Sequence, residues 1–168
     1  MIPYRPDPAA TATTDTNALD RAASLRLLIV MSRALRSITA PARAQLKQFG
    51  LSTTEFGVLE ALYHKGPLPL SALAERVLIT GASMTYTVKQ LEARGLVQRR
   101  TSATDQRFVF GELTDSGRTL IAQVFPQHAE QLRLGMRGLS RQEKRQAAEL
   151  LKRLGRGVTT TSDDDQHV

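Results

Sequence analysis

The sequence contains no cysteine. Without a thiol the chain cannot form a disulfide or hold an iron–sulfur cluster, and it cannot sense oxidants or quinones through a reactive cysteine. A small molecule that the protein detects must therefore bind non-covalently or react by another chemistry.

Long apolar runs are also missing. The longest strictly apolar run extends from Leu27 to Met31, far short of the roughly 20 residues that a helix needs to span a bilayer. No signal-peptide pattern opens the chain. We therefore expect a cytoplasmic protein with no membrane partner.

The short motifs of common enzyme classes are absent from the sequence. Residues 81–85, Gly-Ala-Ser-Met-Thr, have the first glycine and the serine of a nucleophile elbow but lack its second glycine. There is no phosphate-binding glycine loop and no His-Glu-x-x-His metal pair. His64, His128 and His167 are scattered along the chain, which favours structural or solvated roles. We expect no catalytic residue, no metal site and no cofactor.

Basic residues are in excess, with a net charge of +7 and a pI near 10.4. Part of the excess is local: between Arg76 and Arg107 there are six Lys or Arg residues against Glu92 and Asp105, a local net charge of +4. Such a charge favours a polyanionic partner, which is a nucleic acid or an anionic membrane surface.

Residues 71–113 change from helical to strand-like apolar spacing. Ser71 is placed as the N-cap of a helix that runs to Val77, and residues 78–81 predict a turn that uses Gly81. A second helix follows from Ala82 to Arg94 and ends at Gly95. Two short helices joined by such a turn are typical of a helix-turn-helix that binds double-stranded DNA.

The second of these helices has two chemically different sides. Met84, Val88 and Leu91 recur at intervals of four and three, which predicts a buried face. The other side carries side chains that can donate hydrogen bonds to bases and phosphates: Ser83, Tyr86, Thr87, Lys89, Gln90 and Arg94. The alternative is a helix face that is only solvated.

After Gly95 the pattern predicts an antiparallel hairpin. Its strands cover about residues 96–100 and 108–113, and its tip covers about 102–106. Arg99, Arg100 and Arg107 are concentrated around the tip, where a basic hairpin can straddle the phosphate backbone and insert an arginine into the minor groove. Arginines near a turn can also serve solubility alone.

Several short motifs together resemble the MarR (multiple antibiotic resistance regulator) family of bacterial transcription factors. They are Gly50-Leu51-Ser52 followed by Glu55-Phe56 and Val58-Leu59, Leu91-Glu92-x-x-Gly95-Leu96-Val97-x-Arg99, Asp105-x-Arg107, and Leu113-Thr114-x-x-Gly117. Residues 79–85 and the Phe125-Pro126-x-His128 string look closest to members that respond to phenolic or quinone-like compounds. One departure is Gln106, where family wings often carry arginine between the Asp and Arg equivalent to Asp105 and Arg107.

The resemblance implies a mainly α fold, in which a winged helix-turn-helix with a small antiparallel β wing is flanked by dimerisation helices. We assign residues 49–114 to the DNA-binding region and residues 19–48 and 115–158 to the helical dimerisation region. Residues 1–18 and the acidic residues 159–168 lack periodicity, so we expect disordered tails.

Outside residues 71–113 the pattern predicts four helices. The first ends near Thr39, or is kinked by Pro41 and continues to Gln48. The others cover about 53–64, 114–134 with Thr114 as cap, and the stretch after a Ser140–Glu143 capping box to about Leu154. Apolar stripes on the terminal helices suit a membrane surface, a partner groove or a twin chain, and the resemblance implies the twin chain.

The expected function is therefore a sequence-specific DNA-binding regulator, a homodimeric repressor that binds a palindromic operator and is released by a small aromatic or phenolic ligand. The alternative is a constitutive or architectural DNA-binding protein without an effector. The DNA-contacting set includes Arg99, Asp105 and Arg107 of the wing. The resemblance also implies a ligand pocket lined by Tyr63, His64 and His128.

Overall fold

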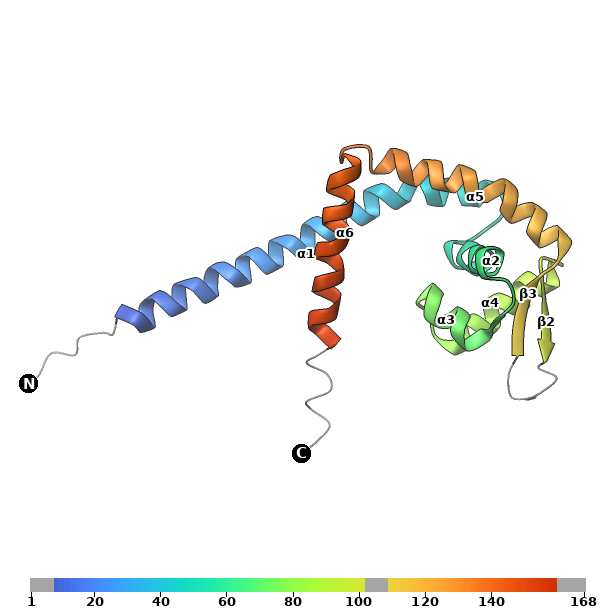
Figure 1. Cartoon of the computed structure of the whole chain (residues 1–168), viewed down its shortest axis with the longest axis horizontal. Helices are drawn as coiled ribbons and strands as arrows, with labels where there is room; N and C mark the ends of the chain where they lie inside the picture. Colours follow the sequence, from blue (N-terminus) through green and yellow to red (C-terminus); the bar gives the residue numbers. More distant parts are fainter. Residues whose placement is uncertain (1–7, 102–108, 160–168) are drawn as a thin grey trace, which may run out of the picture.

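The computed structural model describes residues 8–101 and 109–159. The described helices and strands are, in chain order, α1 (Pro8–Gln48), α2 (Thr53–Lys65), β1 (Leu68–Pro69), α3 (Leu70–Val77), α4 (Gly81–Ala93), β2 (Val97–Thr101), β3 (Val109–Leu113), α5 (Asp115–Gly135) and α6 (Arg141–Thr159). The predicted fold class is confirmed: the chain is mainly helical, with a winged helix-turn-helix and a small antiparallel sheet (Figure 1).

Helices α2, α3 and α4 and the sheet form a lobe at one end of the molecule, and α1 extends from it as a long arm (Figure 1). Helix α5 lies along the C-terminal part of α1, which it contacts over much of its length. Gly135 makes the approach close, since a Cβ atom there would lie 3.2 Å from the backbone oxygen of Ile38. Helix α6 then crosses the direction of α1.

The hydrophobic core lies in the lobe and contains residues from helices α1 to α5 and from the wing strands. It contains Leu46 from α1, Leu59 and Leu62 from α2, Leu73 from α3, and Ile121 from α5, all at most 1% exposed. Helix α4 adds Met84, Val88 and Leu91. The lobe is therefore anchored to the α1–α5 pair by shared apolar contacts, and this packing fixes how α4 is presented.

Helix α1 begins earlier than predicted, and it ends at Gln48, one of the two predicted alternatives. It begins at Pro8, so the expectation of disorder was wrong for residues 8–18, while residues 1–7 lie outside the described residues. Proline is favoured in the first helical turn, and the alanines that follow favour a helix without any apolar periodicity. The helix also continues through Pro41 to Gln48, because Ala42 and Leu46 beyond the proline are buried.

The helix-turn-helix begins differently from the prediction. Ser71 is not an N-cap: α3 starts at Leu70, directly after β1, and Pro69 gives no side-chain capping bond. The short strand β1 was not predicted, and it pairs with β3 through Leu68 opposite Gly111. The left-handed residue of the turn is Leu78, with φ of 58°, and Gly81 is the first residue of α4 instead of a turn residue.

The other caps and the wing strands follow the sequence signals. Ser52 and Glu55 form a capping box at α2, Thr114 caps α5, and the backbone N–H of Ser140 donates to Glu143. Helix α6 continues past Leu154 to Thr159, so Thr159 is helical and does not belong to the predicted disordered tail. Residues 160–168, including His167, lie outside the described part of the chain.

Candidate nucleic-acid interface

Helix α4 is held by its apolar side and by an N-terminal cap. Met84, Val88 and Leu91 are completely buried in the lobe core. At the start of the helix the side-chain oxygen of Thr80 accepts a hydrogen bond from the Ser83 backbone N–H, and its hydroxyl donates to the Ser83 hydroxyl at 3.0 Å. These contacts fix the rotation of α4, and with it the set of side chains that face outward.

The exposed side of α4 consists of eight residues, which are Gly81, Ala82, Ser83, Thr85, Tyr86, Lys89, Gln90 and Ala93. Four of them were predicted as DNA contacts, namely Ser83, Tyr86, Lys89 and Gln90, and all four are accessible. Tyr86 is the largest accessible side chain, at 66% exposed. The surface can therefore offer hydroxyl, ammonium and amide groups to a duplex.

Thr87 is a correction to the predicted set. It is only 7% exposed, and its hydroxyl donates to the backbone oxygen of Ser83 at 2.8 Å. Residues 84, 87, 88 and 91 follow the spacing of a single buried helix face, so this position turns inward. Thr85 was missed for the same reason, because it lies on the exposed side that this spacing defines.

Arg94 is held within the lobe. Its Nη1 atom lies 2.9 Å from Oε1 of Glu55, whose other carboxylate oxygen accepts the backbone N–H of Ser52. The guanidinium thus joins the C-terminal end of α4 to the capping box of α2. The paired charge of Arg94 therefore helps to hold α4 in place, while its role as a DNA contact stays a prediction.

Arg99 connects the wing to the end of α4. Its Nε and Nη2 atoms lie 2.8 and 2.7 Å from Oε2 of Glu92. The hydrogen bond from Arg99 is the main cause that lowers the pKa of the Glu92 carboxyl below its usual value, so the pair stays charged. The ion pair of Arg99 therefore holds the wing against the end of α4. Its exposed neighbour Arg100 lies opposite Phe110 on β3. Asp105 and Arg107 lie outside the described residues.

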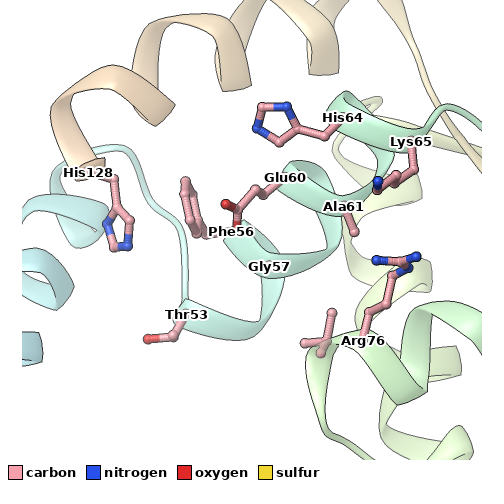
Figure 2. A pocket seen from close by; sticks show the side chains of 10 residues that line it. Thr53, Phe56, Gly57, Glu60, Ala61, His64, Lys65, Arg76 and His128 are labelled. Atoms are coloured by element: carbon pink, nitrogen blue, oxygen red, sulfur yellow. The ribbon is translucent and has the colours of Figure 1, made fainter. Parts of the chain in front are cut away.

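A separate hollow of about 450 Å³ lies where α2, α3 and α5 meet (Figure 2). It contains two of the three residues predicted to bind a ligand, His64 and His128, together with the cations Lys65 and Arg76. The third, Tyr63, does not line this hollow, and instead borders a neighbouring one with His64 and Arg118. The structure thus brings the two histidines together and separates Tyr63 from His128.

Aromatic packing orders the two histidines. The ring centroids of His128 and Phe56 are 4.2 Å apart, and those of His64 and Phe125 are 4.7 Å apart. Among the residues that the structure describes, the buried Nδ1 atom of His128 has no hydrogen-bond partner. Burial also lowers the pKa of the imidazole, which favours its neutral form.

Within residues 8–101 and 109–159, every helix is too short or too polar to span a membrane. No group of three or more His, Asp or Glu side chains in these ranges is arranged to hold a metal ion.

Comparison with known proteins gives concordant matches. A family model described as MarR family matches residues 49–107. The HTH-type transcriptional regulator MhqR of Bacillus subtilis is 42% identical over 132 residues, which cover 79% of this chain and 91% of MhqR.

Two solved structures are also similar. The Streptomyces coelicolor MarR family regulator Sco3205, solved in complex with DNA, shares the fold with a TM-score of 0.75 at 23% identity, over 81% of this chain and 88% of that one. Bordetella bronchiseptica BpsR, whose DNA binding is regulated by 6-hydroxynicotinic acid, has a TM-score of 0.69 at 26% identity, over 77% and 98%.

Proposed function

The chain belongs to the MarR family of helix-turn-helix transcriptional regulators, and from this premise we propose that it is a homodimeric repressor of transcription in the cytoplasm. It binds a palindromic operator in double-stranded DNA, and a small aromatic or phenolic ligand releases it. The observation that supports this proposal best is the exposed side of α4, which stands next to a braced basic wing.

The chemistry of this surface suits a duplex. An α-helix fits the major groove and presents its outward side chains to base edges. Lys89 and Arg100 are exposed on α4 and β2, where they can approach phosphates. Ser83, Tyr86 and Gln90 remain the proposed polar contacts of α4, and Asp105 and Arg107 remain the proposed contacts of the wing tip.

The dimer follows from apolar surface that the single chain leaves uncovered. Leu25 and Leu28 on α1 and Leu150 on α6 are each at least 60% exposed. Leu27, Leu151 and Leu154 are also exposed and face a common hollow between the two helices. Burial of each such side chain against a twin would stabilise the dimer by about 1.5–3 kcal/mol. Two-fold symmetry would then place two α4 helices on successive major-groove turns.

The ligand is proposed to occupy the hollow between α2, α3 and α5. Phe56 offers an aromatic surface there, and His128 and His64 offer polar ring atoms. The charged side chains of the lining are Lys65, Arg76 and Glu60, two positive and one negative. A small aromatic compound with a hydroxyl or acidic group matches these features. Because the hollow contacts both α3 and α5, its occupation can change how the lobe is held against the α1–α5 pair.

The test is a selection with the full chain. Duplexes that it retains from a random-sequence library should contain a palindrome with half-sites about one helical turn apart. Affinity for the selected duplex should fall steeply with salt. Addition of 6-hydroxynicotinate and simple phenols, with an aliphatic acid as control, tests release. Failure to enrich any sequence would refute specific regulation, and enrichment without release by any aromatic compound would support a regulator that has no such effector.

A further inference from the structure

The first two turns of α4 carry an unusual surface for a helix that enters the major groove. Residues 81–88 read Gly-Ala-Ser-Met-Thr-Tyr-Thr-Val and include no charged and no amide side chain. Arg and Lys contact guanine, and Asn and Gln contact adenine, through paired hydrogen bonds. The first side chains of those types on α4 are Lys89 and Gln90, in its third turn. The beginning of α4 therefore lacks the usual hydrogen-bonding readers of guanine and adenine.

Besides the hydroxyls of Ser83 and Tyr86, this surface offers apolar groups. Ala82, Thr85 and Tyr86 are exposed together on one side, at positions i, i+3 and i+4. The hydroxyl of Thr85 donates to the backbone oxygen of Gly81 at 3.0 Å, so its proton is already used. The group that Thr85 can still present is its methyl, together with oxygen lone pairs that only accept. A methyl, a second methyl and an aromatic ring thus lie side by side.

At Gly81, the first residue of α4, the helix backbone is accessible to a molecule outside the chain. A Cβ atom built on Gly81 would have no heavy atom of the lobe within 4 Å, and the residue does not adopt a positive φ. Neither packing nor conformation within the chain requires glycine here. Its missing side chain leaves room for DNA to approach the helix next to Ala82.

From these contacts we infer that Ala82, Thr85 and Tyr86 read thymine through its C5 methyl group. Thymine is the base that presents a methyl in the major groove, and alanine, the threonine methyl and aromatic rings are the side chains that pack against it. From Ala82 to Tyr86 the helix rises about 6 Å, close to the spacing of two base steps. Each half-site should therefore contain two T·A pairs, two base steps apart, facing the start of α4. This inference rests on the proposed function and specifies what that site reads.

The probe is a duplex that the full chain selects from a random-sequence library. In this duplex, replacement of each thymine in turn by deoxyuridine removes one methyl and leaves every hydrogen-bonding group in place. At two positions of each half-site, two base steps apart, we expect binding to weaken about three- to fivefold per methyl, while deoxyuridine at the other thymines changes little.

Matched variants identify the reader. Thr85→Ser loses the methyl, so replacement of one thymine by deoxyuridine should no longer weaken its binding. Thr85→Val keeps the methyl, so the same replacement should still weaken its binding. Tyr86→Phe should likewise still show such weakening, and Tyr86→Ala should not. Thermal unfolding of each variant separates a lost contact from a lost fold.

Two results would overturn the inference while leaving the proposed function intact. One is that the selected half-sites have G·C pairs opposite the start of α4, and the other is that the duplex binds with full affinity after deoxyuridine replaces all its thymines. A chain that selects no duplex would instead refute the proposed function itself. The two failures are therefore distinguishable.

Discussion

Glu55 and Arg94 are 39 residues apart in the sequence and form an ion pair of 2.9 Å that joins α2 to the end of α4. The carboxylate of Glu55 also closes the capping box with Ser52. The same side chain thus stabilises the start of one helix and the position of another. Its two roles can be separated by substitution.

Glu55→Ala should destabilise the fold more than Arg94→Ala, because it removes the cap contact as well as the ion pair. We expect a coupling energy between the two substitutions of about 0.5–1 kcal/mol, since the arginine is partly exposed. Urea unfolding of both single variants and the double variant measures it. Strictly additive effects would show that the ion pair contributes nothing.

Gly81→Ala should separate stability from DNA binding. Alanine is the better helix former, by up to about 1 kcal/mol, and the position has free space within the lobe. The free energy of unfolding should therefore stay equal or rise, while affinity for the selected duplex falls because the new methyl meets the DNA. Equal or tighter binding by the variant would show that α4 does not approach the duplex closely at this residue.

Leu78 adopts a left-handed conformation with φ of 58° and is 89% exposed, so its side chain gains almost nothing from packing. A non-glycine residue in this conformation costs roughly 1 kcal/mol. Leu78→Gly should relieve this strain and increase the free energy of unfolding. Leu78→Ala, which keeps the Cβ atom, is the matched control and should not give the same gain.

The fold should lose stability in mild acid through His128. Burial lowers the pKa of this group in the folded chain below its ordinary value of 6.5, so the unfolded chain binds the proton more tightly. Stability from this group is complete above about pH 6.5 and decreases as the pH falls towards the lower folded pKa. Unfolding measured from pH 8 to pH 5 should show a smaller loss in His128→Asn, and an identical loss would contradict the assignment.

The dimer depends on the exposed leucines of α6. Leu151→Glu places a charge in the apolar stripe formed with Leu150 and Leu154, and should shift the chain to a monomer in sedimentation. Lys152→Glu, on the neighbouring polar position, is the control and should leave the dimer intact. Removal of residues 140–168 should have the same effect as Leu151→Glu. A dimer that survives both changes would exclude α6 from the interface.

The helix ends illustrate which features can be predicted from sequence. Thr114, and Ser140 with Glu143, cap helices as expected, and Ser52 with Glu55 forms a further capping box. Each cap is made within about one turn of chain, so the residues that decide it are adjacent in the sequence. The wing strands β2 and β3 likewise follow from alternation and a nearby turn.

The failures have a different origin. Strand β1 has only two residues, too few for any alternation, and exists because β3 pairs with it from more than forty residues away. The sequence also left open whether α1 ends near Thr39 or passes Pro41, and the helix passes it because the residues beyond the proline are buried against the lobe. In both cases a distant segment compensates for a weak or unfavourable local signal.

The sequence by itself determined the winged helix-turn-helix, the identity of α4 as the outward helix and the excess of positive charge, because periodicity, caps and composition are local properties. Only the tertiary structure decided which of its polar side chains are available. Thr87 is turned into the core and Arg94 is paired with Glu55, while Thr85 is exposed. These outcomes depend on how α4 is rotated against α2 and the core, and that rotation is set by packing between segments far apart in the chain.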